Sequence, residues 1–173
     1  MIYQIYLYHR KYIMTFILPQ NTVFYKLERA IKLYRRMAQS YIDSAGFDVS
    51  LNQLILLIQL STNPSSTQVE LAGHIFKDYA SVARMVDLLV KKGYLTRTEN
   101  QEDRRKKDLS PTAKCEDMLD KVKSVMTGYR HQALIGIDEK SQKLLSEILD
   151  KFSHNCESAV DGININFKGS MAS

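Results

Sequence analysis

The sequence has few of the residues that define several protein classes. Its 173 residues include two cysteines, three prolines and seven glycines. Two cysteines exclude a disulfide scaffold and fit a reducing compartment. So few glycines and prolines exclude collagen-like or linker-dominated chains. No apolar run reaches the ~20 residues of a membrane span, because charged residues interrupt the nearest one, residues 1–18. We therefore expect a cytoplasmic protein with no membrane partner.

The sequence also lacks the common signatures of catalysis. It contains no glycine-rich phosphate loop, no G-x-S-x-G motif and no C-x-x-C or H-x-x-x-H spacing. The four histidines are scattered, and only the pair His154 and Cys156 leaves a metal-responsive role open as an alternative. We expect no enzyme, no cofactor and no metal site.

The overall composition of the chain is that of a globular protein. Hydrophobic residues make up 45% and charged residues 25% of the chain, which excludes global disorder. The formal net charge is +5, with seven basic and three acidic residues between Lys91 and Lys107. A local basic excess of this kind permits nucleic acid as a partner.

Helical patterns occupy the first half of the chain. Apolar residues step by three and four from Phe24 on, which predicts a helix with Asn21 as its N-cap and Gly46 as its stop. Residues 50–53 and 67–70 have the pattern of capping boxes, so each predicts the start of a further helix.

The periodicity changes in the middle of the chain. Asp78 is expected to cap a helix over residues 79–92, and Gly93 to end it. Alternating residues over 94–98 and again over 104–109 predict two short strands of a hairpin.

Two more helices are expected after the hairpin. Ser110-Pro111 has the pattern of an N-cap followed by proline at the first helical position. Apolar residues then step by four and three over 115–133, and Gly136 is expected to end that helix. Asp138 is expected to cap the last one. The expected order is four helices, a hairpin and two helices.

Two short helices joined by the tight segment 74–78 and followed by a charged hairpin indicate a winged helix-turn-helix. Its second helix would enter a major groove of DNA, where Arg84 could contact guanine through both arms of its guanidinium. The basic hairpin could reach a phosphate or a minor groove. The expected DNA-binding residues are Lys77, Tyr79, Ala80, Ser81, Arg84, Arg97, Arg104, Arg105, Lys106 and Lys107.

Residues 67–114 resemble the helix-turn-helix and wing of the multiple antibiotic resistance regulator (MarR) family of bacterial transcription factors. The matching positions, in chain order, are Leu71-Ala72, Ser81-Val82, Arg84, Leu89 to Gly93, Asp103-Arg104-Arg105, Leu109 and Thr112. The helix order extends the resemblance to about residues 20–160. Pro111, Asp108 and Cys115 depart from the family pattern.

The resemblance implies a homodimer that places its recognition helices in successive major grooves of a pseudo-palindromic operator. It implies that Arg105 enters the minor groove, with Arg104 as the second candidate. It also implies that Asp103 is an acidic brace that holds either the wing arginine or the recognition helix. We expect a repressor that an effector releases from DNA. An aromatic small-molecule effector is a candidate partner, and Tyr34, Met37, Tyr41 and Tyr129 are the candidates to line its pocket. The alternative is that these residues, which recur at helical spacing, only pack in the core.

The expected fold class is mainly α, a winged helix with six helices and a two-stranded β-wing. Residues 47–110 would form the DNA-binding domain, and residues 20–46 and 111–160 the helical dimerisation region. An N-terminal extension (1–19) and a C-terminal tail (161–173) complete the chain, and Met14 is an alternative natural start.

Two alternatives stay open at this point. One is a winged-helix module that contacts proteins and has lost DNA binding. The other is a metal- or redox-responsive member of the same family. Cys115 and Cys156 both lie on apolar stripes, so we expect them to be small buried hydrophobic residues rather than redox sensors.

Overall fold

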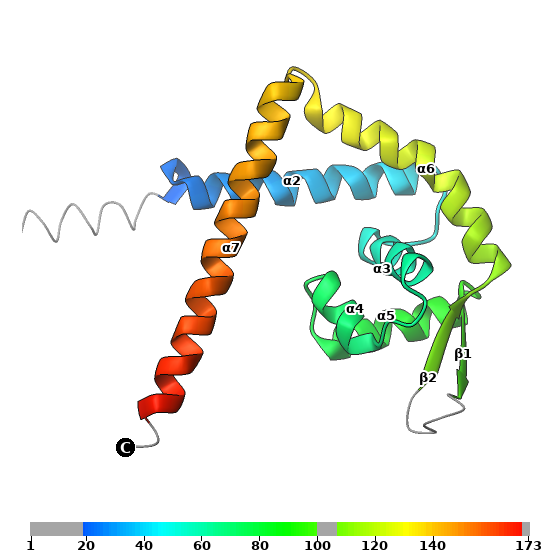
Figure 1. Ribbon diagram of the computed structural model, residues 1–173. Helices are drawn as coiled ribbons and strands as arrows, with labels where there is room; N and C mark the ends of the chain where they lie inside the picture. The colour runs from blue at the N-terminus through cyan, green and yellow to red at the C-terminus, as the bar shows by residue number, and fades with distance from the viewer. Residues whose placement is uncertain (1–18, 100–106, 171–173) are drawn as a thin grey trace, which may run out of the picture. The chain divides into compact units, whose positions relative to one another are not determined.

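The computed structural model confirms a mainly helical winged-helix fold. It describes the backbone of residues 19–99 and 107–170, and the side chains of residues 20–99 and 108–160. The elements follow in the expected order: η1 (Pro19–Asn21), α2 (Val23–Ser44), α3 (Leu51–Thr62), α4 (Gln68–His74), α5 (Tyr79–Lys91), β1 (Leu95–Glu99), β2 (Lys107–Pro111), α6 (Ala113–Leu134) and α7 (Glu139–Ser170) (Figure 1). The chain divides into two compact units, residues 1–130 and 131–173. None of the described helices combines the length and the hydropathy that a membrane crossing requires.

Both predicted capping boxes are present. The Ser50 hydroxyl accepts from the Gln53 amide at 3.2 Å, and the Ser50 amide donates to the Gln53 side chain at 2.9 Å. Thr67 and Glu70 make the same reciprocal pair at 3.3 and 2.7 Å. These bonds satisfy amides that a helix start leaves without partners, so the sequence defines where α3 and α4 begin.

The predicted cap of α2 is wrong by one residue. Asn21 lies in the short η1 helix, and the Thr22 hydroxyl accepts from the Tyr25 amide at 3.2 Å. Threonine is a good N-cap with its backbone extended, as it is here, so it replaces asparagine in this role.

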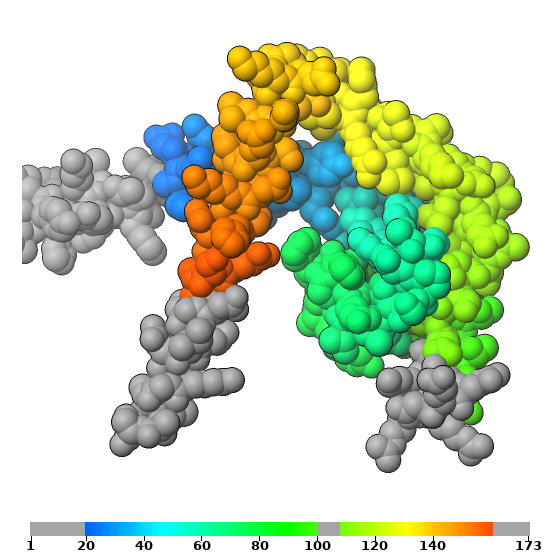
Figure 2. Space-filling view, in the orientation of Figure 1, coloured from blue at the N-terminus to red at the C-terminus, as the bar shows by residue number. Residues whose placement is uncertain are grey.

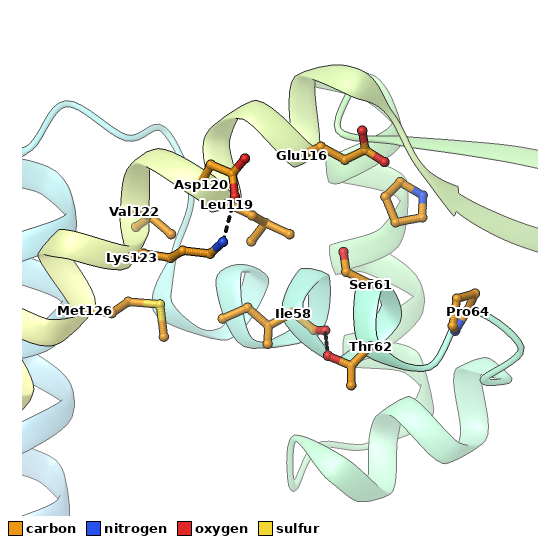
Figure 3. Close-up of a pocket in the computed structure, with 11 residues that line it drawn as sticks. Ile58, Ser61, Thr62, Pro64, Glu116, Leu119, Asp120, Val122, Lys123 and Met126 are labelled. Carbon is orange, nitrogen blue, oxygen red and sulfur yellow. Dashed lines mark hydrogen bonds and ion pairs between the residues drawn. The ribbon is translucent and has the colours of Figure 1, made fainter.

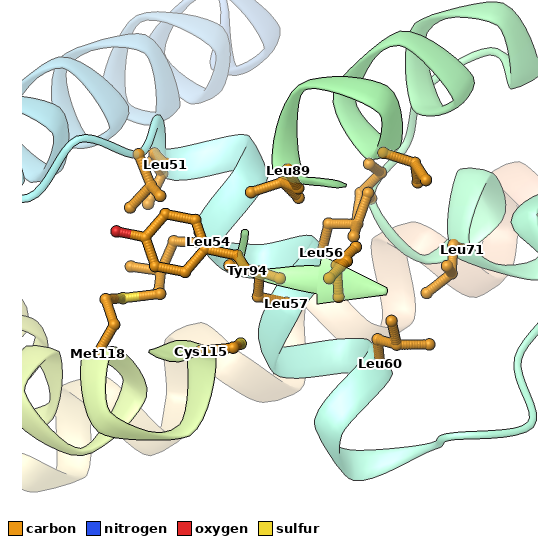
Figure 4. Packing of buried hydrophobic residues seen from close by; sticks show 14 of the residues in the cluster. Leu51, Leu54, Leu56, Leu57, Leu60, Leu71, Leu89, Tyr94, Cys115 and Met118 are labelled. Atoms are coloured by element: carbon orange, nitrogen blue, oxygen red, sulfur yellow. The ribbon is translucent and has the colours of Figure 1, made fainter. Parts of the chain in front are cut away.

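Helix α3 lies at the centre of the core of residues 1–130. Four of its leucines are fully buried, and Val82, Val86 and Leu89 of α5 are buried with them in the same cluster. Figure 4 shows the Tyr94 ring beside Leu54, with Met118 of α6 nearby. The apolar face of α5 is thus turned inward, which leaves its opposite face to solvent.

The hairpin ends later than the sequence pattern indicated. Strands β1 and β2 pair antiparallel, from Leu95 opposite Pro111 to Glu99 opposite Lys107. Pro111 is therefore the last residue of β2, and the expectation that Ser110-Pro111 starts a helix is wrong. A proline is tolerated there because a strand end needs no further N–H donor.

Thr112 caps α6 in place of Ser110. Its hydroxyl accepts from the Cys115 amide at 3.3 Å and donates to the Gly93 carbonyl at 2.7 Å. Its amide donates to the Tyr94 carbonyl at 3.1 Å. One residue thus ends the hairpin and begins the next helix.

The two cysteines differ in their surroundings. Cys115 is fully buried, as expected, and burial raises the pKa of its thiol. Cys156 is exposed on α7, so the expectation that it is buried is wrong for the single chain. The position of Cys156 on an apolar stripe did not decide its burial, because neighbouring apolar residues of α7 are also exposed.

Candidate nucleic-acid interface

The N-terminal half of α5 presents a polar surface. Tyr79 is 57% exposed, and Lys77, Ala80 and Arg84 are also exposed, while Ser81 is half-buried. The structure therefore brings five of the predicted DNA-binding residues together on the solvent side of one short segment.

An N-cap network fixes the start of this helix. Asp78 accepts from the Ser81 amide at 2.8 Å and from the Ser81 hydroxyl at 2.7 Å. Hydrogen bonds from the Ser81 side chain and amide hold the pKa of Asp78 below its usual value. Arg84 donates to the Ser81 hydroxyl at 3.5 Å, and none of the ion pairs among described residues includes Arg84. Its guanidinium is therefore available to an outside partner.

Arg97 connects the hairpin to α5. Its guanidinium donates to the Asp87 carboxylate at 2.7 Å, and the two side chains are 33% and 63% exposed. The predicted brace, Asp103, lies outside the described residues, whereas Asp87 braces the first strand from α5. Sequence reasoning missed Asp87 because only the register of the hairpin beside α5 shows which carboxylate faces Arg97.

The basic tip of the hairpin is only partly described. Asp103, Arg104, Arg105 and Lys106 lie outside the described residues. Lys107 opens β2, with its backbone opposite Glu99. The described part of the hairpin thus fixes where this basic segment joins the fold.

A polar cluster anchors the base of the hairpin. The Tyr94 hydroxyl donates to the Asp48 carboxylate, and Lys92 lies 3.8 Å from that carboxylate. Lys114 donates to the Lys92 carbonyl at 2.8 Å and lies 4.3 Å from the centre of the Tyr94 ring. Burial and the bond to Asp48 raise the pKa of Tyr94 to about 12, and the same bond lowers the pKa of Asp48. The cluster joins the α2–α3 loop, the end of α5 and the start of α6.

Three of the four predicted effector-pocket residues lie together. Tyr129 is 2% exposed, with its ring centre 5.8 Å from that of Tyr34 and 6.3 Å from that of Tyr41, both edge-on. Met37 is half-buried against the core. Burial raises the pKa of Tyr129. A hollow of about 530 Å³ lies beside Tyr41.

A larger cavity, of about 700 Å³, lies between α3 and α6. Ile58 and Ser61 of α3 face Leu119 and Lys123 of α6 across it, and Met126 closes one side (Figure 3). The space-filling view shows α6, in yellow-green, lying along the cyan and green residues of α3–α5 (Figure 2). Sequence reasoning missed this cavity because its two walls are about 60 residues apart in the chain.

Metal ligation finds no support in the described part of the chain. No group of three or more His, Cys, Asp or Glu side chains gathers there in a way that could hold an ion.

Comparison with known proteins finds one matching family. Residues 49–107 match the MarR family model. The chain is 28% identical over 109 residues to HTH-type transcriptional regulator BilQ of Clostridium symbiosum (strain WAL-14163), a match that covers 63% of this chain and 76% of BilQ.

Solved structures share the fold. A mutant of E. coli MarR complexed with operator DNA aligns with a TM-score of 0.71 and 19% identity, covering 80% of this chain and 96% of that one. Bordetella bronchiseptica BpsR, from work on the regulation of its DNA binding by 6-hydroxynicotinic acid, aligns with a TM-score of 0.71 and 18% identity, covering 78% and 94%. Residues 49–107 therefore match the MarR family of transcriptional regulators, and the chain shares the winged-helix fold of the solved structures.

Proposed function

We propose that the protein is a homodimeric repressor that binds a pseudo-palindromic operator in double-stranded DNA. The observation that carries this proposal is the exposed N-terminal half of α5, where Arg84 lies outside every described ion pair. The helix lies within the matched family residues and beside a basic hairpin. Such a protein would act in the cytoplasm, where its DNA is.

The side chains divide into two kinds of DNA contact. Arg84 reads a base edge in the major groove, because a guanidinium can bond both acceptors of guanine. Tyr79, Ala80 and Ser81 lie beside it, and Lys77 pairs with a phosphate. In the hairpin, Arg105 enters the minor groove and Asp103 braces the tip. Arg104, Lys106 and Lys107 supply phosphate contacts, which set affinity and salt dependence rather than sequence preference.

Two exposed apolar faces support the homodimer. On α2, Phe24, Leu27 and Ile31 are 64%, 37% and 48% exposed. On α7, Leu145 and Ile148 are 46% and 55% exposed. Contiguous apolar surface on helices is a common mark of an interface, and a second copy would bury it with two-fold symmetry. We assign residues 20–46 and 111–160 to this dimerisation region and residues 47–110 to DNA binding.

The cavity between α3 and α6 supports a response to a small effector. Its volume lies in the range of ligand sites. Six apolar residues line it together with five polar ones, which are Ser61, Thr62, Glu116, Asp120 and Lys123. It is also lined by Pro111, the last residue of the hairpin, so a ligand there touches the base of the wing. A ligand shifts an equilibrium only by binding one conformation more tightly than the other. An aromatic effector that binds more tightly when the wing lies in a position unsuited to DNA would therefore release the operator. The tyrosine cluster of Tyr34, Tyr41 and Tyr129, with Met37, is the second candidate.

Gel shifts with the DNA upstream of the protein's own gene test the proposal. We expect Arg84→Ala to weaken binding by about 1–3 kcal/mol and to relax sequence preference at one position of each half-site. Arg105→Ala should weaken binding to all duplexes. Lys121→Ala, on the exposed surface of α6, is the charge-matched control and should leave the shift unchanged.

The outcomes separate the alternatives. If both arginine variants bind like the wild type, the site assignment is wrong. If the wild type binds no DNA, the protein-contact module is favoured. If added zinc or oxidation of the thiols changes binding, the metal- or redox-responsive alternative gains support.

Effector binding has its own test. A panel of aromatic acids that includes 6-hydroxynicotinic acid would be titrated against the protein–DNA complex. We expect Met126→Trp, which fills the α3–α6 cavity, to abolish release by an active compound, and Tyr41→Ala to leave release intact. The reverse result would move the effector site to the tyrosine cluster.

A further inference from the structure

Phe76 has an unusual backbone conformation in the turn between α4 and α5. Its φ is +53°, and it is the only non-glycine residue with positive φ among those that the structure describes. Its amide donates to the Gly73 carbonyl at 3.2 Å, and the next amide donates to the Ala72 carbonyl at 3.0 Å, so this turn is well defined. Glycine and asparagine are the residues that suit such a position, and a phenylalanine there is strained.

The Phe76 side chain makes no packing contact with the core that would offset this strain. It is 92% exposed, more than any other large hydrophobic residue described. It is absent from the hydrophobic core and from the residues packed against it. The neighbouring Ile75, only 6% exposed, anchors the turn to the core instead. Folding therefore does not explain why an aromatic ring stands at this position.

The surroundings of the ring indicate the partner. Phe76 is followed by exposed Lys77 and, at the start of α5, by Tyr79 and Ala80, with Arg84 one turn further along. The turn enters the recognition helix at the end that a helix-turn-helix directs toward DNA. The only charged neighbours in the turn are the cation Lys77 and the anion Asp78, whose carboxylate caps α5. An apolar ring beside an exposed lysine fits a nucleic-acid backbone, where deoxyribose offers apolar surface between phosphates.

We propose that Phe76 is a DNA-contact residue whose ring packs on the deoxyribose of the backbone strand beside the major groove. This inference rests on the proposed function. A sugar contact is the same at every nucleotide and involves no charge. Phe76 therefore contributes to affinity without affecting sequence preference or the number of counterions released.

The test compares Phe76→Asn with the wild-type full-length protein. Asparagine tolerates positive φ, so we expect the variant to be more stable, with a higher urea midpoint. We expect its Kd for operator DNA to rise about tenfold, which corresponds to ~1.4 kcal/mol. Its sequence preference and the slope of log Kd against log salt should stay as in the wild type. This combination of greater stability and weaker binding is one that a purely structural role would not produce.

Two controls define the contact. Phe76→Tyr keeps the ring and should bind within about twofold of wild type, a difference of ~0.4 kcal/mol. Lys77→Ala, in the same turn, should reduce the salt slope by about one, as loss of a phosphate contact does. If Phe76→Asn binds with wild-type affinity, or if Phe76→Tyr shares the full loss, the inference is overturned. If the wild type itself binds no DNA, it is the proposed function that fails.

Discussion

Tyr94 is a single side chain that joins the loop before α3 to the core and to the start of α6. Its hydroxyl bonds to Asp48 in the loop before α3, while its ring packs in the core and under Lys114 (Figure 4). Its pKa of about 12 exceeds the unfolded value of 10.0, since burial and the nearby carboxylate disfavour the phenolate. The stability that this group contributes is thus complete below pH 10 and is lost as the pH rises from 10 to 12.

Tyr94→Phe tests this contribution. We expect the free energy of unfolding to fall by about 1 kcal/mol at neutral pH, because one hydrogen bond to a carboxylate is lost. The gap between variant and wild type should narrow between pH 10 and 12. Urea unfolding over a pH series measures it, and a gap that stays constant through that range would contradict the account. Tyr129 stays in both proteins, so its own titration cancels.

We expect the Asp87–Arg97 pair to hold the hairpin in position beside α5 rather than to stabilise the fold. Both side chains are partly exposed, so its loss should cost less than about 1 kcal/mol of unfolding free energy. We expect Asp87→Ala and Arg97→Ala each to weaken operator binding several-fold, because the hairpin is then free to move from α5. The double variant should be little worse than either single variant. If Asp87→Ala binds more tightly than the wild type, Arg97 contacts phosphate directly instead.

At the level of elements, the short α4 depends on its cap. Seven residues are too few for a helix to be stable alone, so the Thr67–Glu70 box is expected to matter more than a typical surface bond. Thr67→Ala should reduce the free energy of unfolding by about 1 kcal/mol, and Thr67→Ser should restore most of it. The urea midpoints of the two variants provide the comparison. Equal losses in both would show that the hydroxyl is not what stabilises α4.

Local signals in the sequence predicted the elements better than they predicted the contacts between them. The two capping boxes and the Asp78 cap depend on residues three positions apart, and all three occur as expected. The predicted end of the hairpin was wrong because the pattern at Ser110-Pro111 is compatible with a helix start and also with a strand end. The pairing of Pro111 with Leu95 shows that it is a strand end.

Contacts between residues that are far apart in the sequence could not be predicted from any local sequence pattern. The bond between Asp48 and Tyr94 joins residues 46 positions apart, and the α3–α6 cavity arises only where two helices pack. Helix α5 could be predicted because its buried residues recur at helical spacing, which leaves Arg84 on the other face. The conformation of Phe76 could not be predicted, since nothing in the sequence requires an aromatic residue at positive φ.

At the scale of the whole molecule, the proposed repressor consists of two copies of the chain. The exposed apolar face of α2 is expected to be covered in the dimer, so Leu27→Glu combined with Ile31→Glu should yield a monomer that keeps its helical content. Sedimentation equilibrium and circular dichroism measure both properties. Lys32→Glu, a charge change on the same helix, is the control and should remain dimeric. A wild type that sediments as a monomer would contradict the dimer.

The central claim is sequence-specific, electrostatically driven binding of DNA. Its most direct test is a fluorescence anisotropy titration at several salt concentrations, with a duplex carrying the inverted repeat upstream of the gene and with a scrambled duplex. We predict that log K falls linearly with log salt and that the inverted repeat binds at least about 10³-fold more tightly than the scrambled duplex. Equal affinity for the two duplexes, or no binding at low salt, would contradict the account.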